Sequence, residues 1–507
     1  MSRSVAAAAG AALLAAVLVT GPVAAHAIGG TFQLPVPLWL YLAGAAIAVA
    51  ASFAVTVLAT RTATGPVAYA TRAIPTGVAV ATRIGLRILG LAWWYGAIAA
   101  GILVGDISPL PAVLLWIGIW VGLPIVAVLA GNPWPSLSPF RTTFAALEWL
   151  AGRLGARRLD LGVRYPRALA RWPAVALLAA GIWAELILPG RQVAGTVAAL
   201  MLGYTVLTLA GMLAVGPVAW LRHAELFEVE LAWFGRIGPL ARRSIGADLC
   251  AECAERCDPA RCLDCPDCAA AAEDDERRPA LRPWIVGLTD VARPGWSDAA
   301  FILLVLAGVT YDGLRETAVG ATLFNAFYPS VSAIGGPASA VTFLVVETLQ
   351  FAAILVAFVA AFVTVAAATR ALAGNRATPL GSVAGRYAAT LLPIAAGYLI
   401  AHYLTLVIQG VIWLPSLLVD PLMTIAPQLD GIPIAAVWYV SVAAIVGGHI
   451  AGIVLAHRLA LADAPGRATV AGLPMVALMI GYTVLSLWII AAPIVVDPGT
   501  VPAAVAR

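Results

Sequence analysis

The stretch VTFLVVETLQFAAILVAFVAAFVTVAAAT, residues 341–369, carries a single charged side chain, that of Glu347. Apart from Glu347, Gln350 and a few threonines, it consists of apolar residues. A membrane-spanning helix needs roughly 20 consecutive apolar residues, because each adds ~1.5 Å of rise across a hydrocarbon layer of ~30 Å. The stretch exceeds that length, so it predicts a transmembrane helix that tilts or extends past the membrane.

Further apolar runs of this kind predict an all-α fold, a polytopic transmembrane helix bundle of about ten spans with a small cysteine-rich insert. The chain has 507 residues, of which 62% are hydrophobic and 11% are charged, whereas soluble domains carry about 25% charged residues. This composition excludes a soluble protein. We expect spans at 38–59, 86–105, 110–131, 173–188, 193–215, 299–315, 338–369, 387–409, 434–461 and 470–496.

The arginines predict the orientation of these spans. All 30 basic residues are arginine, and the cytoplasmic loops of membrane proteins carry an excess of basic residues. When the predicted loops alternate between two sides, 26 arginines fall on one side and three on the other, with Arg3 in the N-terminal segment. We therefore predict a multi-pass protein of the cell membrane, with the arginine-rich loops in the cytoplasm and both ends of the mature chain outside.

The expected organisation has four parts. These are a signal peptide or N-terminal hydrophobic helix at 1–27, a membrane domain with the first five spans at 28–244, a cytoplasmic cysteine-rich metal-binding loop at 245–296, and a membrane domain with the last five spans at 297–507. Two segments of the first membrane domain, 139–154 and 220–236, look amphipathic. We expect both to lie on the inner membrane surface.

All six cysteines lie between residues 250 and 268, at Cys250, Cys253, Cys257, Cys262, Cys265 and Cys268. Disulfides are rare in the reducing cytoplasm, and two C-x2-C turns can supply the four thiolates of a tetrahedral zinc site. We expect zinc here, with the outer two C-x2-C pairs as ligands. The alternatives are an iron–sulfur cluster, because the last three cysteines give C-x2-C-x2-C, or thiols without a metal.

Four ionisable residues inside predicted spans are candidates for a functional site: Asp312, Glu347, His402 and His449. A charged group at membrane depth costs about 2.5–3.5 kcal/mol on insertion scales, so it is a functional candidate by default. Their positions along the spans put all four between the midplane and the outer surface, and we expect them to share one site. Histidine and carboxylate ligands suit a divalent metal such as zinc, iron, manganese or copper, while the same groups could relay protons. The structural alternatives are single hydrogen bonds to neighbouring helices and an Asp312–Arg315 pair.

Short motifs spread over most of the chain resemble the bacterial integral membrane proteins that carry the name fenitrothion hydrolase. The matching stretches are Leu34–Tyr41, Gly131–Trp134, Trp220–His223, Tyr311–Gly313, Ala401–Leu404, Gly448–His449 and Gly481–Thr483. The resemblance implies hydrolysis of an organophosphate triester, which needs an activated water and a Lewis acid on the phosphoryl oxygen. It implies catalytic roles for Asp312, His402 and His449, which lie in matching stretches, while Glu347 joins them by depth alone. The cysteine segment lies outside the resemblance.

Three hypotheses for the function follow. The first is a metal-dependent hydrolase whose active site opens outward, the second a permease or metal-handling protein that uses the same polar residues as a pathway, and the third a redox or assembly component built on the cysteine segment. Neither a P-loop nor a Rossmann glycine pattern, a G-x-S-x-G elbow or an H-E-x-x-H motif is present in the sequence. We expect the lipid bilayer and a small-molecule substrate as partners, and no nucleic acid.

Overall fold

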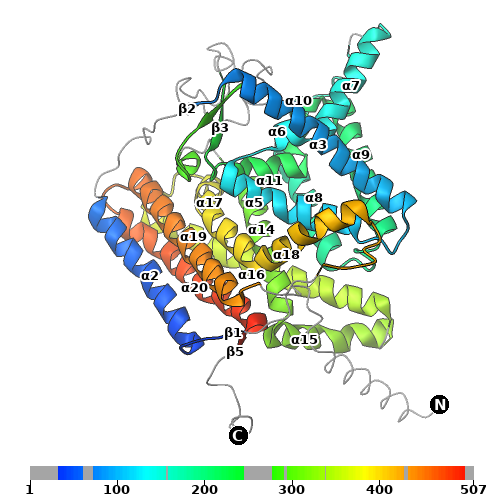
Figure 1. Cartoon of the computed structure of the whole chain (residues 1–507). Coiled ribbons are helices and arrows are strands. Elements are labelled where there is room, and N and C mark those ends of the chain that lie inside the picture. The colour runs from blue at the N-terminus through cyan, green and yellow to red at the C-terminus, as the bar shows by residue number, and fades with distance from the viewer. Residues whose placement is uncertain are drawn as a thin grey trace, which may run out of the picture.

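The computed structural model describes residues 32–60, 72–155, 158–244, 277–289, 294–336, 339–427 and 432–496. The predicted signal segment and all six cysteines lie outside these ranges. Within them, nine helices are long and apolar enough to cross a membrane, so the prediction of an all-α, multi-pass membrane protein is confirmed (Figure 1). They are α2 (Leu38–Ala59), α3 (Thr76–Leu103), the run from α4 to α5 (Leu110–Ala130), α9 (Ala194–Val215), α14 (Trp296–Arg315), α16 (Ala340–Leu372), α18 (Leu392–Val419), α19 (Ile434–Asp463) and α20 (Ala468–Ile494).

Shorter helices complete the described part of the fold. They are α6 (Trp134–Leu137), α7 (Pro139–Arg153), α8 (Trp172–Leu186), α10 (Pro217–His223), α11 (Leu226–Gly235), α15 (Ala318–Gly335) and α17 (Leu380–Ala389). The run from α4 (Leu110–Ala112) to α5 (Leu123–Ala130) widens between them into the π-helix η1 (Val113–Gly122). Two 3-10 turns, η2 (Arg167–Leu169) and η4 (Val286–Leu288), lie in loops.

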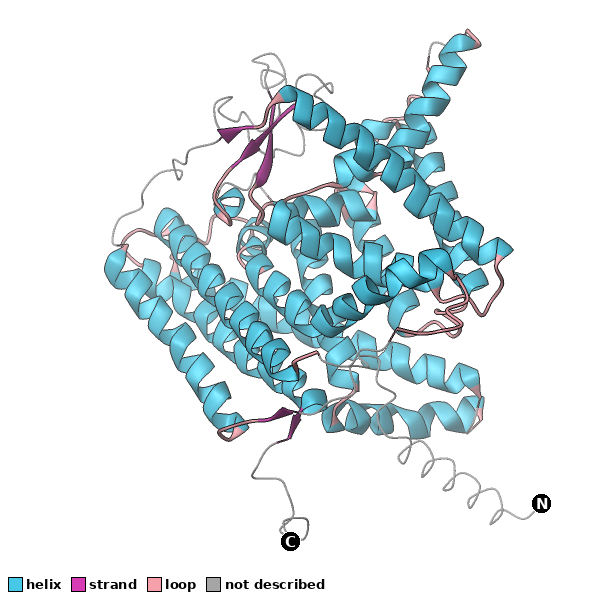
Figure 2. Ribbon diagram, in the orientation of Figure 1, coloured by secondary structure: helices cyan, strands magenta, loops and turns pink. Residues whose placement is uncertain are grey.

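Small β-ladders mark the two ends of the bundle (Figure 2). At one end, β2 (Arg72–Ala73), β4 (Arg277–Leu281) and β3 (Leu240–Ser244) pair antiparallel, in that order; we call this the sheet end. At the opposite end, β1 (Phe32–Gln33) pairs parallel with β5 (Val495–Val496). The segment that holds the cysteines therefore leaves and rejoins the described structure at paired strands.

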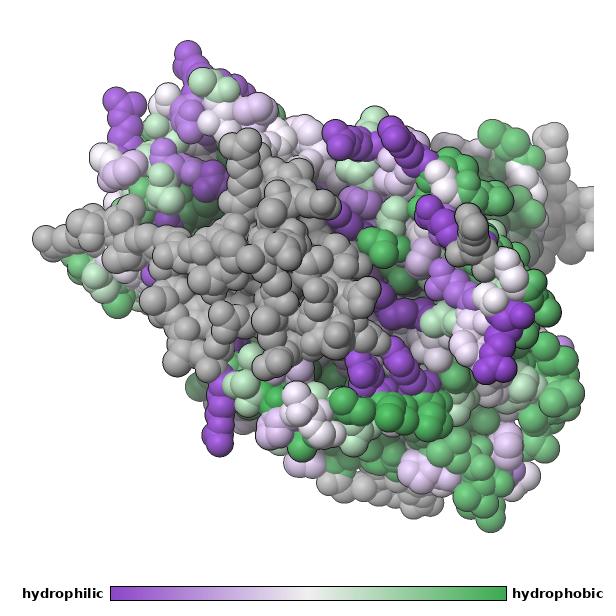
Figure 3. Space-filling view, turned by 90° about the horizontal axis from the view of Figure 1, so that it is seen from above, coloured by the Kyte–Doolittle hydropathy of each residue, from purple (hydrophilic) through white to green (hydrophobic). Residues whose placement is uncertain are grey.

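The surface of the sheet end is rich in hydrophilic residues. Figure 3 looks onto this end and shows purple, hydrophilic side chains gathered over it, with green, hydrophobic ones along the flank of the bundle. Exposed arginine side chains such as those of Arg72 and Arg158 contribute to it. Charged groups at the end of a bundle and apolar groups on its flank are the pattern that a lipid bilayer requires.

Helix α14 lies at the centre of the bundle. It packs against α8, α16, α17 and α18, and 94% of its most apolar stretch is buried inside the protein. A helix that is enclosed by other helices rather than by lipid can hold polar side chains, provided that these find partners. In the last turn of this enclosed helix lie Asp312 and Arg315 near the end of α14.

Helices α18 and α19 approach each other closely at two glycines. A methyl group on Gly397 would lie 2.2 Å from the carbonyl oxygen of Ala444, and one on Gly448 would lie 2.3 Å from the carbonyl oxygen of Pro393. Backbone atoms leave no room for a side chain at either position. The contact fixes α18, which carries His402, against α19, which carries His449.

The segment 220–236 differs from its prediction as a surface helix. Helix α11 is buried along almost its whole length and packs against α5, α8 and α10. Its sequence LFEVELAWFG is apolar on nearly every side, and a helix that is apolar all round is buried rather than amphipathic. The other amphipathic prediction, 139–154, corresponds to α7, of which only Pro139, Phe140 and Phe144 are buried.

Several other boundaries differ from the predicted spans, and the largest differences are that α3 begins at Thr76 rather than at 86 and that α18 ends at Val419 rather than at 409. The fourth predicted span is the 15-residue helix α8, because Pro189 and Gly190 end the apolar run early. The eighth begins at Leu392 rather than at 387, since the chain breaks at Thr390 and Leu391 after the separate helix α17. Helix α15, between the sixth and seventh spans, was not predicted because its apolar run is interrupted by polar residues and Pro329.

Candidate functional site

Asp312 joins two helices through a buried ion pair and a hydrogen bond. His402 of α18 donates through Nε2 to Asp312 Oδ2 at 3.0 Å, and Arg315, one turn after Asp312 on α14, lies 3.2 Å from Oδ1. The side chains of Asp312 and His402 are each 6% exposed. Both carboxylate oxygens are therefore engaged, one by the Arg315 guanidinium and one by the His402 imidazole.

Arg315 connects this pair to its surroundings. Its guanidinium donates to the carbonyl oxygen of Leu186 at 2.8 Å and lies 3.5 Å from the carboxylate of Glu316. Tyr403, the neighbour of His402, also hydrogen-bonds to Asp312. A buried charge is stable only when it is paired, and Arg315 meets that condition, although its Nε has no hydrogen-bond partner among the described residues.

Glu185 extends the cluster across α8. Its carboxylate accepts from Trp120 Nε1 at 2.5 Å, and it is close enough to Asp312 and Arg315 for their charges to act on it. Trp120 lies in the π-helix η1, and π-helical turns occur frequently at functional sites. We call Asp312, Arg315, Glu316, His402, Tyr403 and Glu185 the polar core.

The two predicted histidines do not meet; a row of rings separates them. Tyr398 lies 5.8 Å from His402, Tyr482 lies 5.9 Å from Tyr398, and His449 lies 6.0 Å from Tyr482, each measured between ring centroids. Thr310 donates to the carbonyl oxygen of Leu306, so it is Tyr482 that donates in the 2.8 Å contact between the two hydroxyl groups of Tyr482 and Thr310.

His449 presents an open acceptor at the far end of this row. Its Nδ1 lies 2.8 Å from the carbonyl oxygen of Ile445 and must donate there, so Nε2 carries the lone pair of a neutral imidazole. The residue is 0% exposed, and Nε2 has no hydrogen-bond partner among the described residues. The Tyr398 hydroxyl is likewise buried without a described partner.

Glu347 lies at the edge of the polar core. Its backbone carbonyl accepts from the hydroxyl of Tyr311 at 3.2 Å, and its carboxylate is close enough to Arg315 for their charges to interact. Gln350, one turn along α16, instead donates to the carbonyl oxygen of Gly320. Of the four predicted site residues, the structure thus brings Asp312 and His402 into contact, with Glu347 nearby and His449 farther away.

The described residues contain no group of three or more histidine, cysteine, aspartate or glutamate side chains that could hold a metal ion. The expected intramembrane metal site formed by Asp312, Glu347, His402 and His449 therefore has no preformed ligand set in this part of the chain. Arg315 occupies the space beside Asp312 where an ion would otherwise be attracted. The six predicted cysteine ligands fall outside the described residues.

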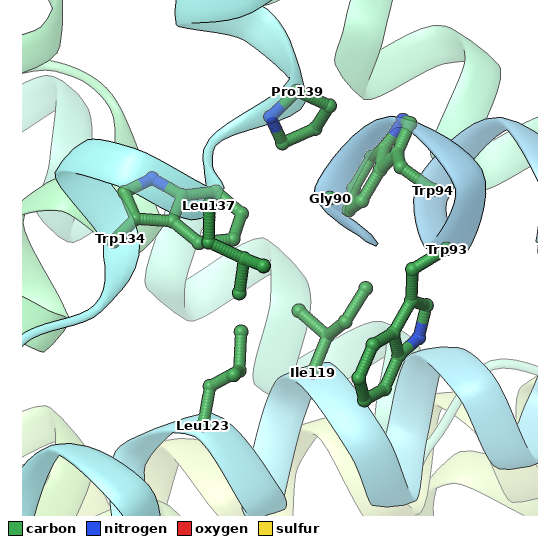
Figure 4. A pocket seen from close by; sticks show the side chains of 8 residues that line it. All are labelled: Gly90, Trp93, Trp94, Ile119, Leu123, Trp134, Leu137 and Pro139. Atoms are coloured by element: carbon green, nitrogen blue, oxygen red, sulfur yellow. The ribbon is translucent and has the colours of Figure 1, made fainter. Parts of the chain in front are cut away.

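A small cavity between α3, η1 and α6 does not serve as a substrate site (Figure 4). It is lined by Gly90, Trp93, Trp94, Ile119, Leu123, Trp134, Leu137 and Pro139. It has space for about one water molecule, and the indole nitrogens of Trp94 and Trp134 donate to Thr205 and Glu225 instead of into it. It is a gap in aromatic packing.

Comparison of the chain with protein-family models, with curated proteins and with solved structures finds no match. The arrangement of the site therefore carries the functional argument.

Two members of the polar core were underestimated from the sequence. Glu185 lies near the end of the fourth predicted span, where the sequence alone favours an interfacial side chain, but its carboxylate accepts a hydrogen bond from the Trp120 indole inside the protein. Arg315 lies at the end of the sixth predicted span and is one of the three arginines on the outer side, yet its side chain is only 16% exposed and joins α14 to the end of α8. A signal for both was present, because each is an ionisable residue inside an apolar run or at its end.

Proposed function

We propose that this protein moves protons through the membrane by way of the polar core, either alone or coupled to a small solute. The observation that carries the proposal is the hydrogen bond between His402 and Asp312, buried between two membrane-spanning helices. Chains of histidine and carboxylate side chains inside membrane helices are the usual proton relays of pumps and transporters. Arg315 pairs with the other carboxylate oxygen of Asp312, so His402 is the partner that holds the exchangeable proton of this hydrogen bond.

The test is proton flux into liposomes that contain the purified protein and an enclosed pH-sensitive dye. With a pH gradient and a potassium–valinomycin potential, the wild type should dissipate the gradient faster than empty liposomes do. His402→Gln keeps a donor for Asp312 but cannot carry a proton, so it should fall to the rate of empty liposomes. His457→Gln is the matched control, because His457 is also buried but contacts the carbonyl oxygen of Thr60 near the sheet end. Equal rates for wild type and empty liposomes would refute the proposal.

Hydrolysis of a phosphotriester is a second candidate. It is favoured by the same contact, because a carboxylate that orients an imidazole is the arrangement of a general base able to take a proton from water. The resemblance to fenitrothion hydrolases adds to this candidate. Release of nitrophenol from a nitrophenyl phosphotriester by the wild type, with loss in His402→Gln and no proton flux in either, is the result that would favour it.

We also propose that the cysteine segment binds zinc. Plasma mass spectrometry of the detergent-purified chain should find about one zinc ion per molecule, and replacement of the six cysteines by serine should remove it. Iron with a visible absorbance band in the wild type would indicate the iron–sulfur alternative instead. The double variant His402→Ala/His449→Ala should keep the full metal content, since the described residues around it form no ligand set; loss of a second metal would restore the intramembrane metal hypothesis.

A further inference from the structure

Helices α10 and α11 form a hairpin that enters the bundle and returns to the end from which it came. It follows α9 at the sheet end and leads into β3, also at the sheet end. At its apex, the ring of Phe227 packs against Trp94, Trp120 and Tyr204. Tyr204 lies about 15 Å of helix rise from either end of α9, so the apex reaches the middle of the bundle.

Glu225 caps the N-terminus of α11 at the apex and is buried there. Its carboxylate accepts from the backbone N–H groups of Phe227 and Glu228, from Trp134 Nε1 at 2.9 Å and from the hydroxyl of Tyr204. Glu225 is 0% exposed, and this burial raises its pKa to about 7, although four donors, two of them at a helix N-terminus, partly offset the cost of burying the carboxylate. When ionised, Glu225 acts strongly on its neighbours, because little water screens it.

Glu230 has the opposite character. It lies on α11 about 7 Å of helix rise from the apex toward the sheet end and is 6% exposed. Its Oε2 has no hydrogen-bond partner among the described residues. Burial, together with the charge of Glu225, raises the pKa of Glu230 to about 8, so the group is a neutral acid at pH 7 and ionises above that pKa.

Among the ionisable residues on the helices that pack against α11, Glu185 of the polar core lies within electrostatic reach of Glu230. Of the helices packed against α11, α8 brings Glu185, whose carboxylate is close enough to feel the charge of Glu230 and, on its other side, that of Asp312. Helix α18 brings His402, and α10 brings Arg222 and His223, while α5 and α6 carry no ionisable side chain.

We propose that Glu230 is the residue that loads protons into the polar core from the sheet end. The proton leaves the Glu230 carboxyl group, crosses by way of intervening water and binds the Glu185 carboxylate; Glu230 then takes a new proton from water at the sheet end. Glu225 acts as a positioning residue, because its carboxylate, when ionised, favours the return of Glu230 to the protonated state. This inference rests on the proposed proton transport and assigns its entry point.

The test uses the full chain in the same liposomes. Glu230→Gln should lose proton flux, whereas Glu148→Gln, a change at an exposed glutamate of α7, should conduct like the wild type. Flux in Glu230→Gln equal to that of the wild type would overturn the inference and leave the proposed function standing. Absence of flux in the wild type would refute the proposed function, and the inference with it.

Two further measurements distinguish the loss of a proton-transfer group from a folding defect in the variant. The infrared band of protonated carboxyl groups should be weaker in Glu230→Gln, and the difference between the two proteins should vanish as the pH is raised through about 8. Treatment of the wild type with dicyclohexylcarbodiimide, which reacts with protonated carboxyl groups in apolar surroundings, should block flux and leave its adduct on Glu230. A block whose adducts map only elsewhere would contradict the inference.

Discussion

Asp312→Ala is expected to destabilise the protein by about 3–5 kcal/mol, the usual cost of removing one partner from a buried ion pair. The change leaves Arg315, at 16% exposure, without its buried counterion and His402 without its acceptor. Arg315 belongs to the central helix α14 and His402 contacts this helix from α18, in a region where water reaches poorly. Thermal unfolding in detergent, followed by tryptophan fluorescence, should show a clearly lowered midpoint and a lower yield of monodisperse protein.

The double variant Asp312→Leu/Arg315→Met is the matched control. Replacement of a whole buried ion pair by apolar side chains of similar volume is often neutral or stabilising, because neither desolvated charge remains. This variant should recover most of the stability that Asp312→Ala loses, yet it should not conduct protons. If Asp312→Ala melts like the wild type, Asp312 and Arg315 do not form a buried ion pair in the membrane protein.

Gly448→Leu should destabilise the packing of α18 on α19 by about 3 kcal/mol or more, at the upper end of the cost of overpacking. A side chain at this position would start 2.3 Å from the carbonyl oxygen of Pro393, and a backbone atom cannot turn aside as a side chain can. The two helices must separate, which would also loosen the contact between His402 and Asp312.

The neighbouring glycine provides the control for this prediction. A methyl group on Gly447 would meet no atom within 4 Å, so Gly447→Leu adds the same side chain to the same helix without a clash. The two variants should therefore differ sharply in melting midpoint in detergent. Similar midpoints for Gly448→Leu and Gly447→Leu would show that α19 does not contact the backbone of α18 at Gly448.

The membrane architecture follows from the sequence because the length of an apolar run is a physical requirement of the bilayer. Every predicted span corresponds to a helix, and most boundaries differ by a few residues. The errors have a common cause. Run length does not distinguish apolar residues that face lipid from those that face protein, so α11 was placed on the surface and the separate helix α17 was merged with α18.

The site was predicted less completely than the fold. Depth along the spans grouped Asp312 with His402, and these two side chains are in contact. Depth alone gives no information on which helices are neighbours or where each side chain turns, so it placed His449 in the same site although two tyrosine rings separate it from His402. The role of Trp120 as donor to Glu185 depends on the π-helix η1. The apolar sequence of this span does not predict such a local widening of the helix.

The strand pairing at the two ends also determines whether the number of helices that cross the bundle is even or odd. Strands β2 and β3 belong to one ladder, so the chain between Ala73 and Leu240 must cross an even number of times to return to the same end. The long helices of that interval, α3, the run from α4 to α5, and α9, give three crossings, and the α10–α11 hairpin turns back and adds none. The short helix α8 must therefore make the fourth crossing. The parallel pair of β1 and β5 requires an even number of crossings between Phe32 and Val496, and α8 raises the nine long helices of the described residues to ten.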